Sequence, residues 1–126
     1  MLNKRLVKAI HRRLIAEFGG SGGIRDEGLL ESALSRPQNR QVYVADCDIF
    51  EQAGSLAFGI IKNHPFVDGN KRVAAVACEL MIVKEGYEIS AGELEKYKVY
   101  MLLAAGDMPE KEFIDWLRQN SRKKVN

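Results

Sequence analysis

The sequence has little cysteine, and it lacks a long apolar run. Its two cysteines, Cys47 and Cys78, lie far apart without a CxxC pair, so we expect neither metal ligation by these thiols nor a disulfide, and we interpret both as small buried hydrophobic residues. No apolar run approaches the roughly 18 residues of a membrane span. Met1–Phe18 is charged throughout and does not resemble a secretory signal. We therefore expect a soluble, cytoplasmic protein with no membrane partner.

A strong excess of one charge is also absent. Nineteen Lys and Arg residues against 17 Asp and Glu residues give a formal net charge of +2. This is too small to indicate nucleic-acid binding by bulk electrostatics, and no concentrated basic helix points to a DNA-binding protein. The basic run Ser121–Asn126 is the local exception, and we interpret it as a solvated, frayed end. Nucleic acid is not expected as a partner of this chain alone.

Glycine and proline divide the chain into about six helical segments. The 126 residues contain no internal repeat and no linker, so we expect one domain over residues 1–126. Leu6, Ile10, Leu14 and Phe18 recur every four residues and predict the buried face of a first helix, which the following glycine run ends. The expected fold class is all-α.

The second helical segment has clear start and stop signals. Asp26 can cap it, and Pro37 is expected to end it because proline disfavours helical geometry at the residue before it. The β-favouring stretch Gln41-Val42-Tyr43-Val44 follows. We therefore predict a short extended flap or hairpin at these residues, placed to grip another chain.

The later segments are also helical in pattern. A helix is expected to stop at Asn63, before the His-Pro pair, and the nearly all-apolar run Asn70–Lys84 predicts a buried central helix ended by Gly86. Ser90–Glu93 and Asp107–Glu110 have the spacing of capping boxes, which predicts two more helices. Their expected buried residues are Leu94, Tyr97, Met101 and Leu103, then Phe113, Ile114, Trp116 and Leu117.

Residues 63–72 combine side chains that suit phosphate chemistry. A helix that begins near Gly69 would point unpaired N–H groups into the preceding loop, and Gly69 would let a ligand approach the backbone. Lys71 and Arg72 would add positive charge, and Asp68 could help to hold Mg²⁺ together with substrate phosphates. His64 is the plausible base, because the ordinary pKa of histidine lies near neutral pH. The segment predicts a phosphate-transfer site.

Each of these residues also has a purely structural explanation. Asp68 could cap a helix, His64 could be an ordinary loop histidine, and Lys71 and Arg72 could form a solvated face. Pro65 and Phe66 suit a helix stop and a core position. A base, a metal-type carboxylate, a glycine and two cations within one short stretch nevertheless favour the functional interpretation.

The stretch His64-Pro65-Phe66-Val67-Asp68-Gly69-Asn70-Lys71-Arg72 resembles the signature of the Fic/Doc family, His-Pro-Phe-x-Asp/Glu-Gly-Asn-x-Arg, at every fixed position. Ile24–Leu34 is similar to the Doc (death on curing) branch, and chain length and helix order also fit. The resemblance implies a compact, all-α Fic-type bundle.

The resemblance also implies roles for the site residues. In such a site His64 deprotonates a target hydroxyl, Asp68 helps to hold Mg²⁺, Asn70 and the backbone around Gly69 steady the phosphates of ATP, and Arg72 neutralises charge in the transition state. The flap near Gln41–Val44 would align the target. Phosphoryl and nucleotidyl transfer depend mainly on such positioning and neutralisation.

Two positions bear on which group is transferred. Lys71 and Ala75 stand where AMP-transferring relatives carry a glycine and a second arginine, and both departures resemble the Doc branch. We therefore favour a protein serine/threonine kinase that transfers the γ-phosphoryl group of ATP, with a protein adenylyltransferase as the alternative. A catalytically silent binding module is a further alternative, although the presence of His64, Asp68 and Asn70 speaks against it.

The same resemblance implies partners. It suggests the toxin of a toxin–antitoxin pair that inhibits translation by modifying a translation factor such as elongation factor Tu. The sequence contains no Ser/Thr-x-x-x-Glu-Gly/Asn inhibitory motif, so we expect restraint in trans by a small Phd-type antitoxin whose tail folds on binding.

Overall fold

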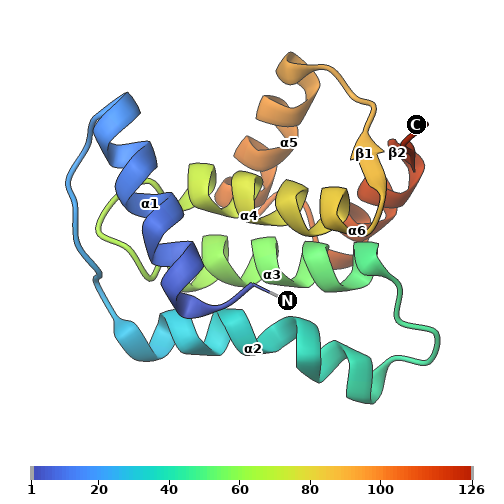
Figure 1. Cartoon of the computed structure of the whole chain (residues 1–126), viewed down its shortest axis with the longest axis horizontal. Helices are drawn as coiled ribbons and strands as arrows, with labels where there is room; N and C mark the ends of the chain where they lie inside the picture. The colour runs from blue at the N-terminus through green and yellow to red at the C-terminus, as the bar shows by residue number, and fades with distance from the viewer. Residues whose placement is uncertain (1, 126) are drawn as a thin grey trace.

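The computed structural model describes residues 2–125, which form six helices and a two-stranded antiparallel sheet (Figure 1). The elements are α1 (Lys4–Phe18), α2 (Glu27–Tyr43), α3 (Ile49–Asn63), α4 (Asn70–Lys84), β1 (Tyr87–Ile89), α5 (Glu93–Ala105), α6 (Glu110–Gln119) and β2 (Ser121–Lys123). The all-α prediction with six helices is confirmed. The sequence patterns did not predict the small sheet.

Helix α3 is the centre of the bundle, packed between α2 and α4 and against α6 (Figure 1). Two of its glycines allow this close packing. A Cβ on Gly54 would lie 2.6 Å from Cγ1 of Ile114 in α6, and one on Gly59 would lie 3.3 Å from Cα of Ala33 in α2. We expected α4 to be the central helix, but α4 leaves Val76 38% exposed on one side. That side forms one wall of the cleft described below.

Helix α2 continues through Pro37, so the predicted helix end at Pro37 and the predicted extended flap at Gln41–Val44 are wrong. Only Val44, the C-cap, has extended backbone angles. Two ion pairs hold the helix on both sides of the proline, because Nη2 of Arg36 and Nη2 of Arg40 each lie 2.7 Å from Oε2 of Glu110. Tertiary contacts thus outweigh the local preferences of proline and of the β-branched residues.

Several helix boundaries agree with the sequence signals. Oδ1 of Asp26 accepts a hydrogen bond from the Leu29 amide at 2.9 Å and caps α2, and α1, α3 and α4 end where predicted. Neither predicted capping box forms, because α5 and α6 start after Gly92 and Pro109 without a side-chain cap. The hydroxyl of Ser90 instead donates to the Asn120 carbonyl at 3.0 Å, beside the sheet.

The predicted buried face of α1 is shifted around the helix. Val7 and His11 are buried, whereas Leu6 and Phe18 are exposed. A spacing of four residues advances about 40° around an α-helix at each step. Leu6 and Phe18 therefore lie on different sides of the helix, and only the middle of the predicted stripe approaches the core.

Helix α5 buries Val99, Tyr100 and Leu103. Leu103 was predicted to be buried and is, but the predictions for Leu94, Tyr97 and Met101 are wrong, because these side chains are exposed. In Figure 1, α5 projects away from the three stacked helices α2, α3 and α4, so only one side of it meets the core. The predicted buried residues of α6 are confirmed for Phe113, Ile114 and Leu117, and Trp116 is half-buried.

The start of the basic C-terminal run is ordered as strand β2, so the prediction of a frayed end is wrong for these residues. Ser121–Lys123 pairs with Tyr87–Ile89, and Nε of Arg122 lies 2.9 Å from Oε1 of Glu88. The pairing with β1 thus provides hydrogen bonds for backbone N–H and C=O groups of this segment. Asn126, the last residue of the run, lies outside the described residues. Among residues 2–125, no helix is both long enough and apolar enough to cross a membrane.

Candidate functional site

The signature residues lie in the loop that joins α3 to α4 (Figure 1). His64 is the C-cap of α3 and adopts the left-handed conformation, with φ 51° and ψ 55°. Its side chain is exposed, while its carbonyl accepts a hydrogen bond from Nε of Arg25 at 2.6 Å. Nη2 of Arg25 donates to the Asn63 carbonyl at 2.6 Å. A cation thus stabilises the carbonyl end of α3 and holds the backbone from which His64 projects.

Asn70 holds the loop from the other side. Its side chain is buried, its Oδ1 accepts from the Phe66 amide at 3.0 Å, and its Nδ2 donates to the Phe66 carbonyl at 2.9 Å. The side-chain amide therefore pairs with both backbone groups of a fully buried residue, as a neighbouring strand would. These contacts occupy Asn70 within the protein, whereas the sequence resemblance suggested contact with phosphates.

The glycine-rich loop between α1 and α2 lies along the signature loop. Ile24 and Phe66 form an antiparallel bridge, in which the Arg25 amide donates to the Pro65 carbonyl at 2.7 Å and the Val67 amide donates to the Gly23 carbonyl at 3.1 Å. In this type of bridge the N–H and C=O groups of Ile24 point away from the signature loop. The α1–α2 loop therefore presents an extended backbone segment next to His64.

Asp68 projects toward the same glycine-rich loop. Its Oδ2 accepts a hydrogen bond from the Ser21 amide at 3.3 Å, and its Oδ1 accepts one from the Gly69 amide at 2.8 Å. A Cβ on Gly20 would lie 2.6 Å from Oδ2 of Asp68, so the loop can approach the carboxylate this closely only with glycine at this position. The carboxylate is fixed in direction but remains exposed.

Helix α4 begins directly after Asp68 with an open N-terminus. Gly69 is the N-cap, with φ 81°, and no side chain caps this end of the helix. A Cβ on Gly69 would lie 3.4 Å from Cδ1 of Ile15 in α1. The left-handed backbone explains the glycine, because other residues rarely adopt this conformation. Ligand approach at Gly69 stays a prediction. The unpaired N–H groups of the first turn favour an anion.

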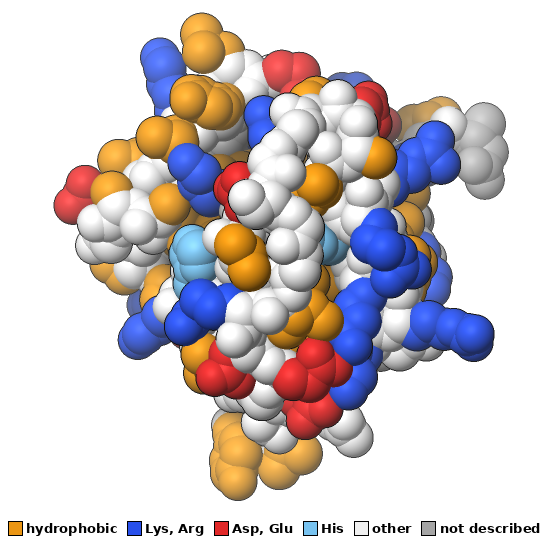
Figure 2. Space-filling model, turned by 90° about the vertical axis from the view of Figure 1, so that its left-hand side faces the viewer, with side chains coloured by type: hydrophobic (Ala, Val, Ile, Leu, Met, Phe, Trp, Pro, Cys, Tyr) orange, Lys and Arg blue, Asp and Glu red, His pale blue; other side chains and the backbone are white. Residues whose placement is uncertain are grey.

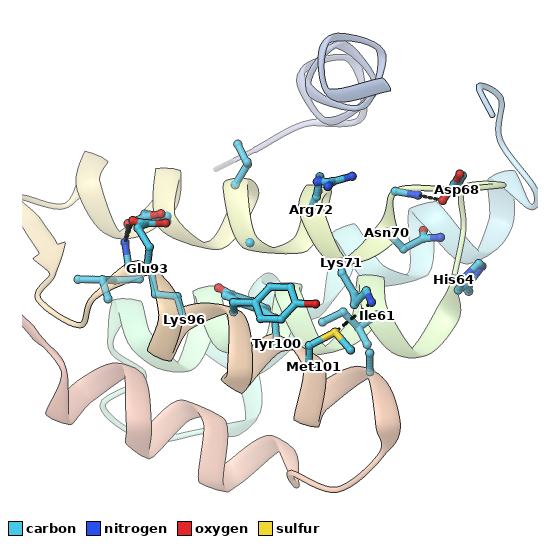
Figure 3. A pocket seen from close by; sticks show the side chains of 17 residues that line it. Ile61, His64, Asp68, Asn70, Lys71, Arg72, Glu93, Lys96, Tyr100 and Met101 are labelled. Carbon is cyan, nitrogen blue, oxygen red and sulfur yellow. Dashed lines mark hydrogen bonds and ion pairs between the residues drawn. The ribbon is translucent and has the colours of Figure 1, made fainter. Parts of the chain in front are cut away.

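The two cations of the signature point in different directions from α4 (Figure 3). Nζ of Lys71 lies 3.2 Å from Sδ of Met101 in α5, whereas the guanidinium of Arg72 lies 4.6 Å from the ring centroid of Phe18 in α1. Within residues 2–125 neither cation has a carboxylate within ion-pair distance. Both charges are therefore available to an anionic ligand at the start of α4.

A cleft of about 790 Å³ opens between α4 and α5, and Figure 3 shows the side chains that line it. At one end are His64, Asp68, Lys71 and Arg72. At the other end Nζ of Lys96 lies 2.8 Å from Oε1 of Glu79 and 3.3 Å from Oε1 of Glu93. Burial by itself would lower the pKa of Lys96, but these carboxylates raise it above the ordinary value. The cleft thus has a cationic end at the signature and an opposite end where one ammonium pairs with two carboxylates.

Figure 2 shows the side of the molecule on which the α1–α2 and α3–α4 loops lie. Histidine is exposed on this face, and Lys and Arg side chains gather on both sides of a strip of backbone. Acidic side chains form a group at the lower edge, and others stand apart from one another elsewhere on this face. Basic groups therefore predominate around the middle of this face.

The predicted target-positioning flap is far from this site. Gln41–Tyr43 end α2 at the opposite end of α3 from His64 (Figure 1). Because α3 has 15 residues and an α-helix rises about 1.5 Å per residue, about 22 Å separate its two ends. The segment beside His64 is the α1–α2 loop, whose glycine run was interpreted from the sequence as the end of the first helix. The features of the sequence that could have pointed to this loop were its glycines and the resemblance of Ile24–Leu34 to the Doc branch.

The site contains one suitably placed carboxylate for a metal ion. Among the described residues, no cluster of three or more His, Cys, Asp or Glu side chains could hold a metal by itself. Asp68 nevertheless keeps unused acceptor capacity on both oxygens, since each receives a single backbone N–H. This fits Mg²⁺, which is commonly held by one or two carboxylates together with the phosphates of a substrate.

Comparisons of the sequence with known proteins identify its family. The family model described as "Fic/DOC family" matches residues 1–82. A protein named "Toxin Doc" from Mycolicibacterium smegmatis is 38% identical over 76 residues, which cover 59% of this chain and 58% of that protein. A protein named "Protein kinase doc" from Escherichia phage P1 is 31% identical over 81 residues, which cover 64% of each chain.

The alignments span less than two thirds of the length of each of these relatives. The family match covers α1 to α4 up to Ile82, and so includes the signature loop, the loop between α1 and α2, and the helices that hold both. The chain belongs to the Fic/DOC family.

Proposed function

We propose that the chain is a toxin-type protein kinase that transfers the γ-phosphoryl group of ATP to a hydroxyl group of a protein. One observation carries this proposal. At one end of a single cleft lie an exposed imidazole, a directed carboxylate, an uncapped helix N-terminus and two cations that have no ion-pair partner within residues 2–125. Phosphoryl transfer requires little more from a protein than such positioning and charge neutralisation.

His64 is proposed as the general base. It takes the proton from the target hydroxyl, whose oxygen forms a bond to the γ-phosphorus while the bond from that phosphorus to the leaving oxygen of ADP breaks. The exposed side chain and the left-handed backbone at His64 support this role, because the imidazole projects from the end of α3 and not along it. Arg25 supports the role indirectly through its hydrogen bond to the His64 carbonyl.

The start of α4 is proposed to bind the phosphates. The N–H groups of its first turn, with Lys71 and Arg72, supply positive potential where negative charge is transferred. Asp68 would hold Mg²⁺, which when bound would neutralise phosphate charge. Asn70 contributes by keeping the signature loop in shape, as its hydrogen bonds to Phe66 support.

The α1–α2 loop is proposed to align the target segment. The backbone N–H and C=O of Ile24 point away from the signature loop, so an extended target segment can pair with this edge. Such pairing would present a hydroxyl side chain beside His64 without requiring a specific target sequence. This role replaces the one first expected for Gln41–Val44.

The alternative activity is transfer of AMP to the same hydroxyl. Lys71 favours phosphoryl transfer, because its side chain extends across the cleft to Met101 and occupies space beside the phosphate-binding end. The name of the phage relative, "Protein kinase doc", supports the same choice. A silent binding module is disfavoured by the exposure of His64 and the free acceptor capacity of Asp68.

The biological partners are proposed from the relatives. The name "Toxin Doc" supports a toxin role, with a Phd-type antitoxin as the restraining partner. We propose a translation factor such as elongation factor Tu as the target, and inhibition of translation as the consequence. Expression of the chain should then stop growth, whereas expression of the His64→Ala variant should not.

The test is incubation of the purified chain with Mg²⁺, a cell lysate and ATP labelled at either the γ- or the α-phosphate. We expect a discrete protein to take up label from γ-labelled ATP alone, with no uptake by His64→Ala. Label from the α-position would establish AMP transfer instead. The absence of either label would contradict transferase activity on proteins in that lysate.

A matched pair of variants tests the phosphate site. Lys71→Ala should slow transfer, whereas Lys84→Ala removes an exposed cation at the other end of α4 and should leave the rate unchanged. An equal effect of both variants would show that general positive charge, and not the position of Lys71, supports the reaction.

A further inference from the structure

A second histidine lies beneath the signature loop, outside the signature itself. His11 of α1 is 3% exposed, and its ring stacks on the ring of Phe66 with 4.0 Å between centroids and 12° between planes. Its Nε2 lies 2.8 Å from the carbonyl oxygen of Asp68. A Cβ on Gly69 would lie 3.7 Å from Cδ2 of His11, so the ring also borders the first residue of the α4 cap. A buried imidazole therefore contacts Phe66 and Asp68 of the signature loop and lies beside Gly69.

The hydrogen bond to the Asp68 carbonyl requires a proton on Nε2 of His11. A carbonyl oxygen only accepts hydrogen bonds, so Nε2 of His11 must carry a proton and donate it to Asp68. The imidazole thereby pins the carbonyl of the peptide that joins Asp68 to Gly69. The burial of His11 and its stack on Phe66 keep the donor in place.

The peptide plane transmits this contact to the carboxylate. In a trans peptide the C=O and N–H groups point in opposite directions. Holding the Asp68 carbonyl toward α1 therefore turns the Gly69 N–H away from α1, and this N–H donates to Oδ1 of Asp68 at 2.8 Å. One chain of hydrogen bonds thus runs from His11 through a rigid peptide group to the carboxylate of Asp68.

We propose that His11 is a positioning residue that sets the direction of the Asp68 carboxylate and of the α4 N-terminus. The expected effect of His11 on catalysis rests on the proposed function. Its structural role does not, because the orientation of the Asp68–Gly69 peptide is a property of the protein without substrate.

Two substitutions separate the hydrogen bond from the packing. His11→Gln places an amide N–H near the position of Nε2 and retains a donor to Asp68, although it loses the stacked ring. His11→Phe retains the ring and its volume but removes the donor. The control is Val7→Ala, which removes buried volume one turn earlier in the same helix and leaves His11 unchanged.

The first readout is the amide of Gly69, followed by ¹H–¹⁵N NMR and by hydrogen exchange in the folded protein without nucleotide. We expect a shifted resonance and faster exchange in His11→Phe, and values near those of the unsubstituted chain in His11→Gln and Val7→Ala. An unchanged Gly69 amide in His11→Phe would overturn the inference, whether or not the chain transfers phosphate.

The second readout is the transfer reaction itself. Small displacements of positioned groups can cost about 100-fold in rate, so we expect His11→Phe to lower kcat by about that factor with little change in KM for the protein target. His11→Gln should recover most of the loss, and Val7→Ala should lower Tm without lowering kcat. Equal loss of kcat in the Gln and Phe variants would overturn the proposed role of the donor. A chain that transfers no label contradicts the proposed function and leaves the NMR result to decide the role of His11.

Discussion

Replacement of Asn70 by alanine should destabilise the fold as well as impair the reaction. Asn70 belongs to the family signature, and a role in binding phosphate would leave stability unaffected by its loss. In the structure its Oδ1 and Nδ2 instead pair with the amide and the carbonyl of Phe66, a residue with no exposed surface. Asn70→Ala removes both partners and leaves two buried backbone groups without hydrogen bonds.

The expected loss of stability follows from the free-energy cost of leaving these two backbone groups without hydrogen bonds. An unsatisfied buried donor or acceptor costs about 1–3 kcal/mol, and part of the cost is recovered where water enters the loop. We therefore expect Asn70→Ala to lower the free energy of unfolding by about 3 kcal/mol, which for a domain of this size corresponds to a fall in Tm of about 10 °C.

The assay is thermal unfolding followed by circular dichroism, with two comparison variants. His64→Ala changes an exposed side chain, and Asn39→Ala changes an exposed asparagine within α2, so both should unfold near the Tm of the unsubstituted chain. A Tm for Asn70→Ala equal to that for Asn39→Ala would refute the structural role. The role would then have to be sought in ligand binding alone.

Three further properties can be predicted. Gly54→Ala should cost about 1–3 kcal/mol of stability in denaturant unfolding, because its Cβ would lie 2.6 Å from an α6 side chain, whereas Gly92→Ala meets no atom within 4 Å and should cost little. Burial raises the pKa of Cys78 to about 12, so this thiol should resist alkylation at pH 8 until the protein unfolds. Burial alone would raise the pKa of Asp48, but the hydrogen bond and charge of Arg118, together with the backbone amides of Glu51 and Phe50, outweigh this and lower it. This stabilisation should be present above about pH 4 and lost as the pH falls through the lowered pKa, and Arg118→Gln should reduce the acid-dependent loss.

The sequence predicted those parts of the fold whose signals are local. The His-Pro pair ends α3, Asp26 caps α2, and the glycine run ends α1, since each of these residues acts on its own backbone or on that of its immediate neighbours. The same holds for the signature loop, in which the order of residues alone places His64 at the end of one helix and Lys71 in the first turn of the next.

The wrong predictions for α2 concern residues whose structure depends on distant partners. Helix α2 passes through Pro37 because Glu110, far along the chain, pairs with arginines on both sides of the proline. No local pattern contains this information. His11 was missed for the same reason, since a histidine on an amphipathic helix has no visible link to a loop that begins more than fifty residues later.

The signature combines exposed side chains with buried ones. His64, Asp68, Lys71 and Arg72 are exposed, whereas Pro65, Phe66 and Asn70 are buried. A loop made only of reactive side chains would have no fixed shape, because nothing would offset the entropy of ordering it. The buried members anchor the loop, and residues outside the signature complete the anchoring.

Those outside residues determine what the signature can do. Arg25 holds the carbonyl of His64, and His11 holds the carbonyl of Asp68, so each proposed catalytic side chain projects from a backbone unit that is fixed by a donor from α1 or from the α1–α2 loop. Positioned groups act faster than mobile ones because the entropy of alignment is lost before the reaction begins. A chain that carried the nine signature residues without these two donors would retain the chemical groups but lose their alignment. The functional unit of this protein therefore includes α1 and the loop after it as well as the signature.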